Sequence, residues 1–119
     1  MAGNPRLICR SGELPDGGKG VRFSLGQGET ARQAFAVRVG DRVYAYLNEC
    51  SHAGLELDWL PGEFFDASGL YLVCSAHGAL FEADTGRCLG GPCRGIGLVP
   101  LPVEERDGLV MLKGSPRDV

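Results

Sequence analysis

The chain has 119 residues, 44% of them hydrophobic, a size that supports one modest core and leaves no room for a second catalytic domain. Its formal net charge of −3 argues against a nucleic-acid-binding protein and fits an acidic carrier that meets basic partner surfaces. No apolar run approaches the length of a signal-peptide core or a membrane span, so we expect a soluble cytoplasmic protein. We therefore expect a single domain over residues 1–119, with a frayed tail at 114–119.

Nineteen glycines and seven prolines at short intervals, without an apolar stripe at helical spacing, predict an all-β chain of short strands joined by turns. The strands expected in chain order cover residues 7–10, 21–25, 34–39, 42–47, 70–73, 79–82, 98–103 and 109–112. Gly40-Asp41 favours a tight hairpin turn between the third and fourth of these. Pro100 and Pro102 cannot donate ladder hydrogen bonds, so strand 98–103 should be irregular or lie at an edge.

Alternation within the central hairpin predicts which side chains share a face of the sheet. Phe35, Val37 and Val39 should lie on one face of their strand, and Val43, Ala45 and Leu47 on one face of the next. Further turns are expected at 84–86 and 106–108, and Gly90-Gly91-Pro92 indicates a loop.

The only two histidines each follow a cysteine closely, as Cys50-Ser51-His52 and Cys74-Ser75-Ala76-His77. The first pair comes where the alternation of strand 42–47 stops, and the second directly follows strand 70–73, so both pairs should lie on loops. The chain between them is long enough for a hairpin and a return strand. Two loops could therefore bring two thiolates and two imidazoles to one four-ligand metal site.

The arrangement of these donors bears on which metal they bind. Structural zinc sites usually place two cysteines in one arm and two histidines in the other, whereas each arm here mixes one cysteine with one histidine. Mixed arms are what a 2Fe-2S cluster needs if both cysteines bind one iron and both histidines bind the other. A structural zinc module that acts as an interaction domain is the alternative from a different class.

The sequence around the pairs carries further motifs, namely His77-Gly78-Ala79-Leu80-Phe81-Glu82, Thr85-Gly86-Arg87-Cys88 and Gly91-Pro92. With them, residues 33–112 resemble a Rieske-type 2Fe-2S protein, in particular the small soluble ferredoxins of bacterial ring-hydroxylating dioxygenase systems. The resemblance implies antiparallel sheets with a cluster-binding subdomain at about 48–95, whose two ligand loops lie at the tip under a proline-containing loop. It also implies that Cys50 and Cys74 hold the inner iron, and His52 and His77 the outer iron.

The resemblance implies a one-electron carrier and not an enzyme. Its electrons would come from a flavin-containing reductase and pass, through the exposed histidine end, to a terminal oxygenase or a similar acceptor. Both histidines are used by the cluster, so none remains for the mononuclear iron of an oxygenase large subunit. The small subunit of an assimilatory nitrite reductase is the alternative within the same fold. We expect a monomer.

Four residues of this chain, at positions where some Rieske proteins carry functional side chains, bear on the reduction potential. Rieske proteins of cytochrome bc-type complexes carry a disulfide between the ligand loops, together with a serine and a tyrosine that donate to cluster sulfurs. The matching residues here are Leu55, Ala76, Ala79 and Phe81. Hydrogen bonds to sulfur stabilise the reduced cluster, so their absence predicts a potential at the low end of the Rieske span, on the order of −150 mV.

Three cysteines lie outside the ligand set. Cys88 and Cys93 could form a disulfide or a second metal site, but a reducing compartment favours buried or loop thiols with a structural use. Cys9 should pack within the first strand.

Overall fold

The computed structural model of the chain describes residues 6–25, 31–49, 57, 62–74, 78–90 and 97–113. In chain order the elements are β1 (Arg6–Arg10), the 3-10 helix η1 (Ser11–Glu13), β2 (Val21–Leu25), β3 (Arg32–Val39), β4 (Arg42–Leu47), β5 (Tyr71–Val73), β6 (Leu80–Glu82), β7 (Cys88–Gly90), β8 (Pro100–Leu101), β9 (Val103–Arg106) and β10 (Leu109–Leu112). The strands form three antiparallel sheets with the orders β1-β10-β9, β2-β3-β4-β8 and β5-β6-β7. The all-β prediction is confirmed.

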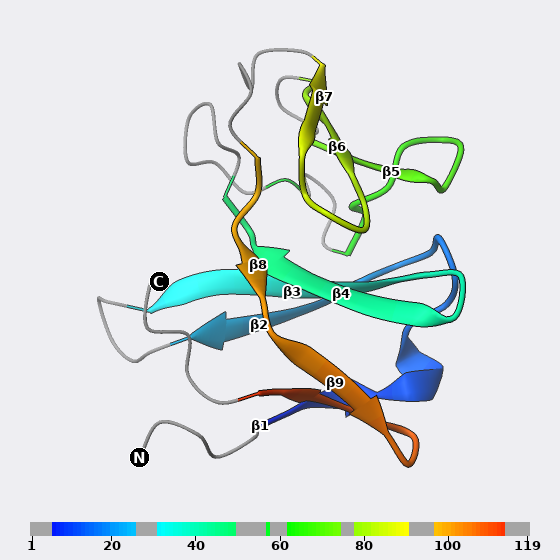
Figure 1. The fold of residues 1–119 in the computed structure, drawn as a ribbon, viewed down its shortest axis with the longest axis vertical. Helices are drawn as coiled ribbons and strands as arrows, with labels where there is room; N and C mark the ends of the chain where they lie inside the picture. Colours follow the sequence, from blue (N-terminus) through cyan, green and yellow to red (C-terminus); the bar gives the residue numbers. More distant parts are fainter. Residues whose placement is uncertain are drawn as a thin grey trace.

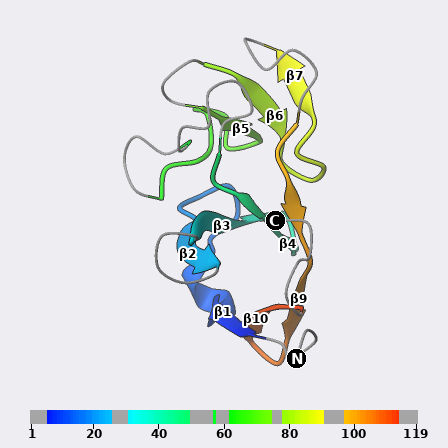
Figure 2. The ribbon, with the colours of Figure 1, turned by 90° about the vertical axis from the view of Figure 1, so that its left-hand side faces the viewer.

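The three sheets follow one another along the long axis of the molecule (Figure 1). The β2-β3-β4-β8 sheet lies in the middle, with β1-β10-β9 on one side of it and β5-β6-β7 on the other, an order also visible in the side view of Figure 2. We call the first two sheets the base, and the β5-β6-β7 sheet with its loops the tip.

The central β3–β4 hairpin is buried on both of its faces. Register pairs Phe35 with Tyr46 and Ala36 with Ala45, so aromatic residues lie on one face and small aliphatic residues on the other. The two predicted sets of face-sharing residues therefore lie on opposite sides of the sheet, because residues alternate along each strand. Gly40 adopts a φ of 64° in the connecting turn, which confirms the expected hairpin.

Each face of the central sheet contributes to a separate core. The face toward β1 and β10 packs mainly aliphatic side chains, among them Cys9, Ala34, Ala36, Ala45, Leu47, Leu101, Val110 and Leu112. The face toward the tip packs aromatic side chains, and the Phe35 and Phe64 rings stack with centroids 4.0 Å apart. Cys9 is buried in β1 as expected, and burial, followed by the charge of Glu13, raises the pKa of its thiol to about 11.

Several strand predictions are wrong in their detail. The strands expected at 7–10 and 34–39 begin at Arg6 and Arg32, and the strand expected at 79–82 begins at Leu80. The strand expected at 98–103 is two strands, because the chain leaves the central sheet after Leu101 and joins β10 at Val103, with Pro102 at the crossing. Strand 70–73 begins one residue later, since the Leu70 N–H donates to the Ser68 hydroxyl at 3.1 Å and not to a strand. β7 was not predicted, because its Cys-Leu-Gly segment has no alternating pattern.

Among the described residues, no helix is both long enough and apolar enough to cross a membrane. The frayed tail expected at 114–119 lies outside the described residues, and the single domain over residues 1–119 stays a prediction.

Candidate functional site

Of the four predicted ligands, the structure describes Cys74, which directly follows β5 and has no exposed surface. Cys50, His52 and His77 lie outside the described residues. Within the described ranges no group of three or more potential metal ligands occurs. The site is therefore described from Cys74 and from the residues that flank each segment carrying a predicted ligand.

The segment that carries the second cysteine–histidine pair is closed at its base by two backbone hydrogen bonds. The Cys74 N–H donates to the Ala79 carbonyl at 2.9 Å, and the Gly78 N–H donates to the Cys74 carbonyl at 2.7 Å. Gly78 has a φ of 74°, a conformation that glycine adopts without strain. The chain thus reverses directly after Cys74 and continues into β6, where Leu80 pairs with Val73.

The segment that carries the first pair is held at its base by a buried amide. The Asn48 side-chain oxygen accepts a hydrogen bond of 2.8 Å from the Leu57 N–H, and both residues are buried. Next to it, Arg32 at the start of β3 forms two hydrogen bonds with the Glu49 carboxylate, at 2.7 and 3.0 Å. This contact raises the pKa of the Arg32 guanidinium. Asn48 therefore ties the two ends of the segment containing Cys50 and His52.

A third segment, residues 91–96, leaves and rejoins the β6–β7 hairpin. Gly90 pairs with Leu80 at its start, and the Leu98 N–H donates to the Gly86 carbonyl at 2.8 Å after its end. The two backbones approach closely here, since a Cβ atom on Gly97 would lie 2.5 Å from the Gly86 oxygen. Glycine is therefore required where this segment returns.

The bases of all three segments contribute to one apolar core. Leu57, Cys74, Ala79 and Leu98 are buried together with Phe81, and Cys88 packs against the same cluster. The Tyr46 hydroxyl on β4 donates to the Ala83 carbonyl at 2.7 Å and so links the central sheet to this core. Residues that flank three segments distant in sequence thus pack in one core, which we call the platform.

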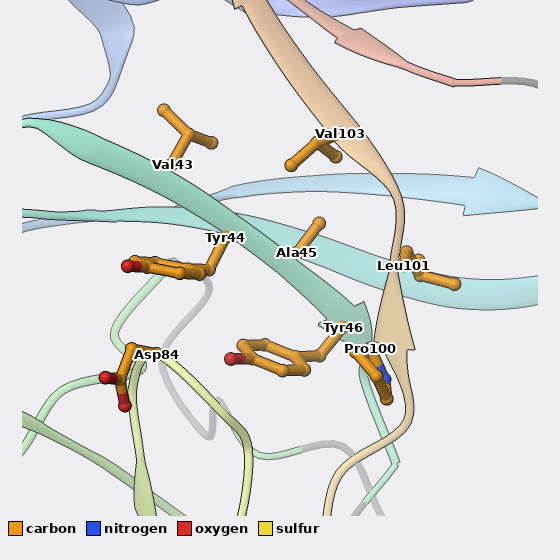
Figure 3. Close-up of a pocket in the computed structure, with 8 residues that line it drawn as sticks. All are labelled: Val43, Tyr44, Ala45, Tyr46, Asp84, Pro100, Leu101 and Val103. Carbon is orange, nitrogen blue, oxygen red and sulfur yellow. The ribbon is translucent and has the colours of Figure 1, made fainter.

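A cavity of about 260 Å³ lies beside this link, and its lining comprises Val43, Tyr44, Ala45, Tyr46, Asp84, Pro100, Leu101 and Val103 (Figure 3). Burial, with the nearby Asp84 charge, raises the pKa of the Tyr46 hydroxyl. The lining includes none of the predicted ligands, and the sequence analysis did not anticipate this cavity.

Comparison with known protein families identifies the family to which this chain belongs. Residues 4–102 match the model of the Rieske [2Fe-2S] domain. The chain belongs to the Rieske family. Membership in this family implies one 2Fe-2S cluster, as the sequence predicts.

Solved structures of Rieske ferredoxins match this chain over nearly its whole length. The Sphingomonas yanoikuyae B1 ferredoxin is 25% identical with a TM-score of 0.71, and the match covers 92% of this chain and 98% of that one. The ferredoxin of carbazole 1,9a-dioxygenase from Nocardioides aromaticivorans IC177 is 26% identical with a TM-score of 0.70, covering 96% and 99%. A chain in the complex of reduced oxygenase and oxidized ferredoxin in carbazole 1,9a-dioxygenase is 25% identical with a TM-score of 0.72, covering 95% of each. No curated protein matches the sequence.

These matches are to electron carriers, and this Rieske protein is likewise an electron-transfer protein and not an enzyme.

The described residues fit a Rieske cluster on the side of the inner iron. Cys74 offers a sulfur donor from a fully buried position, where a thiolate needs a bound metal to compensate for its charge. Ala79 and Phe81, which are both fully buried, have no side-chain hydroxyl to donate to a cluster sulfur. The low potential that the sequence analysis derives from these two residues stays a prediction.

The structure corrects the expectation for one cysteine outside the ligand set. Cys88, in β7, is disulfide-bonded and is not a thiol. The cysteine bonded to it lies outside the described residues, as does Cys93, for which the expectation stays a prediction.

Proposed function

We propose that this Rieske ferredoxin carries single electrons from a flavin-containing reductase to a terminal oxygenase or a similar acceptor. We further propose that Cys50, His52, Cys74 and His77 hold its one cluster. The observation that carries the proposal is the nearly complete overlap with ferredoxins of carbazole dioxygenase, one of which was solved in complex with its oxygenase.

The proposed ligand set agrees with what the described residues do. Cys74 lies buried at the end of β5, where its backbone bonds to Ala79 and Gly78 orient the segment that leads to His77. Asn48 and Leu57 close the segment that contains Cys50 and His52. When bound, the cluster supplies a site that accepts and releases one electron at a time.

The proposal extends to the setting in which the protein works. A single domain over residues 1–119 is supported by the overlap with ferredoxins of nearly equal length. A monomer in the cytoplasm suits a small carrier that must leave its reductase before it reaches its acceptor. The net charge of −3 favours its approach to basic partner faces.

The test combines metal analysis with a redox titration of the purified protein. We expect equal amounts of iron and acid-labile sulfide, a mixed-ligand electron paramagnetic resonance signal after reduction, and a midpoint potential on the order of −150 mV. A flavin reductase should reduce the cluster, and a terminal oxygenase should reoxidise it. A colourless protein with one zinc ion per chain would replace this function with the structural interaction module.

Variants of the proposed ligands test their assignment separately. His52→Cys and His77→Cys should lower the potential wherever a cluster still forms, because each substitution adds a thiolate charge. Cys9→Ser is the matched control. Cys9 is buried in the base, so its substitution should leave the potential unchanged. An unchanged potential in either histidine variant removes that histidine from the ligand set.

A further inference from the structure

The cavity beside the link between base and tip contains none of the proposed cluster ligands, and its walls differ in chemistry. One wall is aliphatic, with Val43 on β4 and Val103 on β9. The other has the Tyr44 and Tyr46 rings of β4 and the Asp84 carboxylate, which lies beyond the end of β6. Both rings extend from β4 in the same direction, with their hydroxyl groups toward the side on which Asp84 lies (Figure 3).

The cavity exists because β8 is shorter than β4. β8 pairs with β4 at Ala45 and Tyr46, and the chain then joins β10 from Val103 onward. Within the described part of the chain, the first residues of β4 therefore have no neighbouring strand on the side away from β3. Val43 and Tyr44 point to opposite faces of β4, because side chains alternate along a strand. Both kinds of side chain thus border the space at this open edge.

The Asp84 carboxylate carries a charge that no basic side chain neutralises among the described residues. Asp84 is exposed, and none of the ion pairs between described residues includes it. Nearby Glu82, by contrast, forms an ion pair with Arg87 at 3.1 Å. The Asp84 charge nevertheless acts on the cavity wall, because after burial it is the largest cause of the raised pKa of the Tyr46 hydroxyl.

The size and chemistry of the cavity suit a long side chain with a cationic end. Its volume of about 260 Å³ is below the roughly 300–1,000 Å³ of sites that hold whole small molecules. Aromatic rings and carboxylates both attract cations, whereas an aliphatic wall packs against methylene groups. The Tyr46 hydroxyl already donates to the Ala83 carbonyl, so Tyr46 offers its ring and not a hydrogen-bond donor.

A guanidinium matches these groups better than an ammonium does. It is planar and stacks on aromatic rings, and it donates two parallel hydrogen bonds to one carboxylate. An ammonium is compact and more strongly hydrated, so it gains less from a partly apolar cavity. Arginine therefore fits the cavity best among the basic residues.

We propose that this cavity receives an arginine side chain of a redox partner. Its guanidinium lies against Tyr44 and Asp84. Its methylene groups pack against Val43 and Val103. The inference rests on the proposed function, because that function supplies the partner, and the net charge of −3 favours a partner with a basic surface. Because the cavity lies where base and tip meet, the contact orients a partner that approaches the tip.

Nuclear magnetic resonance of the cluster-loaded protein with labelled valine methyl groups tests the cavity directly. The probe is N-acetyl-L-arginine amide, and its control at equal ionic strength is N-acetyl-L-citrulline amide, which has a similar shape without the charge. The signals of Val43 and Val103 should shift with the arginine probe alone, whereas those of Val21 and Val110, outside the cavity, should not. Equal shifts with both compounds, or none at the two cavity valines, overturn the proposal. Larger shifts with N-acetyl-L-lysine amide overturn the choice of a guanidinium.

Variants test the acidic and the aromatic wall separately. Asp84→Asn and Tyr44→Leu should each weaken binding of the arginine probe several-fold. Asp41→Asn is the matched control, because it makes the same change of charge at an exposed turn residue outside the cavity, and it should bind the probe like wild type. Equal weakening in Asp41→Asn and Asp84→Asn would show that the overall charge attracts the probe, which overturns the site.

Kinetics with the partners connect the cavity to electron transfer. Asp84→Asn should raise the KM for the ferredoxin several-fold with the flavin reductase or the terminal oxygenase and leave kcat unchanged, because a docking contact contributes to association and not to the electron-transfer step. Asp41→Asn should leave both constants unchanged. A shifted midpoint potential in Asp84→Asn would show that the substitution acts on the cluster, and this result would overturn the docking role.

Failure of this inference and failure of the proposed function give different results. Protein without iron and sulfide refutes the proposed function, while the probe titration still reports on the cavity. Iron-loaded protein that exchanges electrons with both partners, and has the same KM in Asp84→Asn as in wild type, overturns the arginine contact alone.

Discussion

The base and the tip of this molecule are stabilised in different ways. The base contains strands of up to eight residues in β3, whose pairing with β4 extends over six residue pairs. The tip has three strands of three residues each, and so small a sheet is marginal without a surface to pack on. Aromatic contacts supply that surface, through the stacked rings of Phe35 and Phe64 and the bond from Tyr46 to Ala83.

The difference shows how a β fold can present a metal site on short strands. In the base, long paired strands supply most of the stabilising hydrogen bonds. In the tip, where the strands are short, hydrogen bonds at the ends of segments 49–56, 75–77 and 91–96 add to the pairing. Local contacts of this kind can open without unfolding the remaining sheets. The tip should therefore be the first part of the protein to lose its structure, and loss of the cluster should report it.

The largest effect should come from truncating a matched leucine in each half. Leu72→Ala in the tip and Leu112→Ala in the base each remove a buried side chain, and each should lower the free energy of unfolding by about 2–5 kcal/mol. In Leu72→Ala, the visible absorbance of the cluster should disappear at a lower urea concentration than the far-ultraviolet circular dichroism. In Leu112→Ala both signals should shift together. Coincident transitions in Leu72→Ala would show that the halves unfold as one unit.

An intermediate effect should follow from removing the amide at the base of the first segment. Asn48→Ala leaves the buried Leu57 N–H without its acceptor, which should cost about 1–3 kcal/mol and accelerate iron release to a chelator. Glu49→Gln, one residue away, weakens a partly exposed ion pair and should cost about 1 kcal/mol or less. Equal rates of iron release in the two variants would contradict the anchoring role of Asn48.

The smallest effect should appear on acidification, where each half has one carboxylate with a lowered pKa. The hydroxyl of Ser68 lowers the pKa of Asp66 in the tip, and the guanidinium of Arg38 lowers that of Glu105 in the base. A lowered pKa adds stability that is complete above the ordinary value near pH 4 and is lost as the pH falls through the folded-state value. Urea unfolding of the protein without cluster should show this loss below about pH 4.

Neutral variants assign that loss to a half. Asp66→Asn and Glu105→Gln should each make the free energy of unfolding less dependent on pH in this range, by about 1 kcal/mol or less. If neither variant changes the slope, other carboxylates cause the acid sensitivity.

Sequence reasoning succeeded where local patterns are strong. Alternation and the Gly40-Asp41 turn were sufficient to place β2 and β4 at their observed bounds. It failed at β7, whose three residues form a strand only because β6 offers an open edge. It also failed at Cys88, because cysteine spacing alone does not distinguish a disulfide from two thiols.

The amino-acid sequence by itself determined the all-β class, the central hairpin and the Rieske family, because turn residues, alternation and the spacing of cysteine and histidine are local properties of the chain. Only the tertiary structure decided that the central sheet is buried on both faces and that Asn48, Cys74 and Leu98 belong to one platform. These features depend on contacts between residues far apart in the chain, whose partners no local pattern specifies.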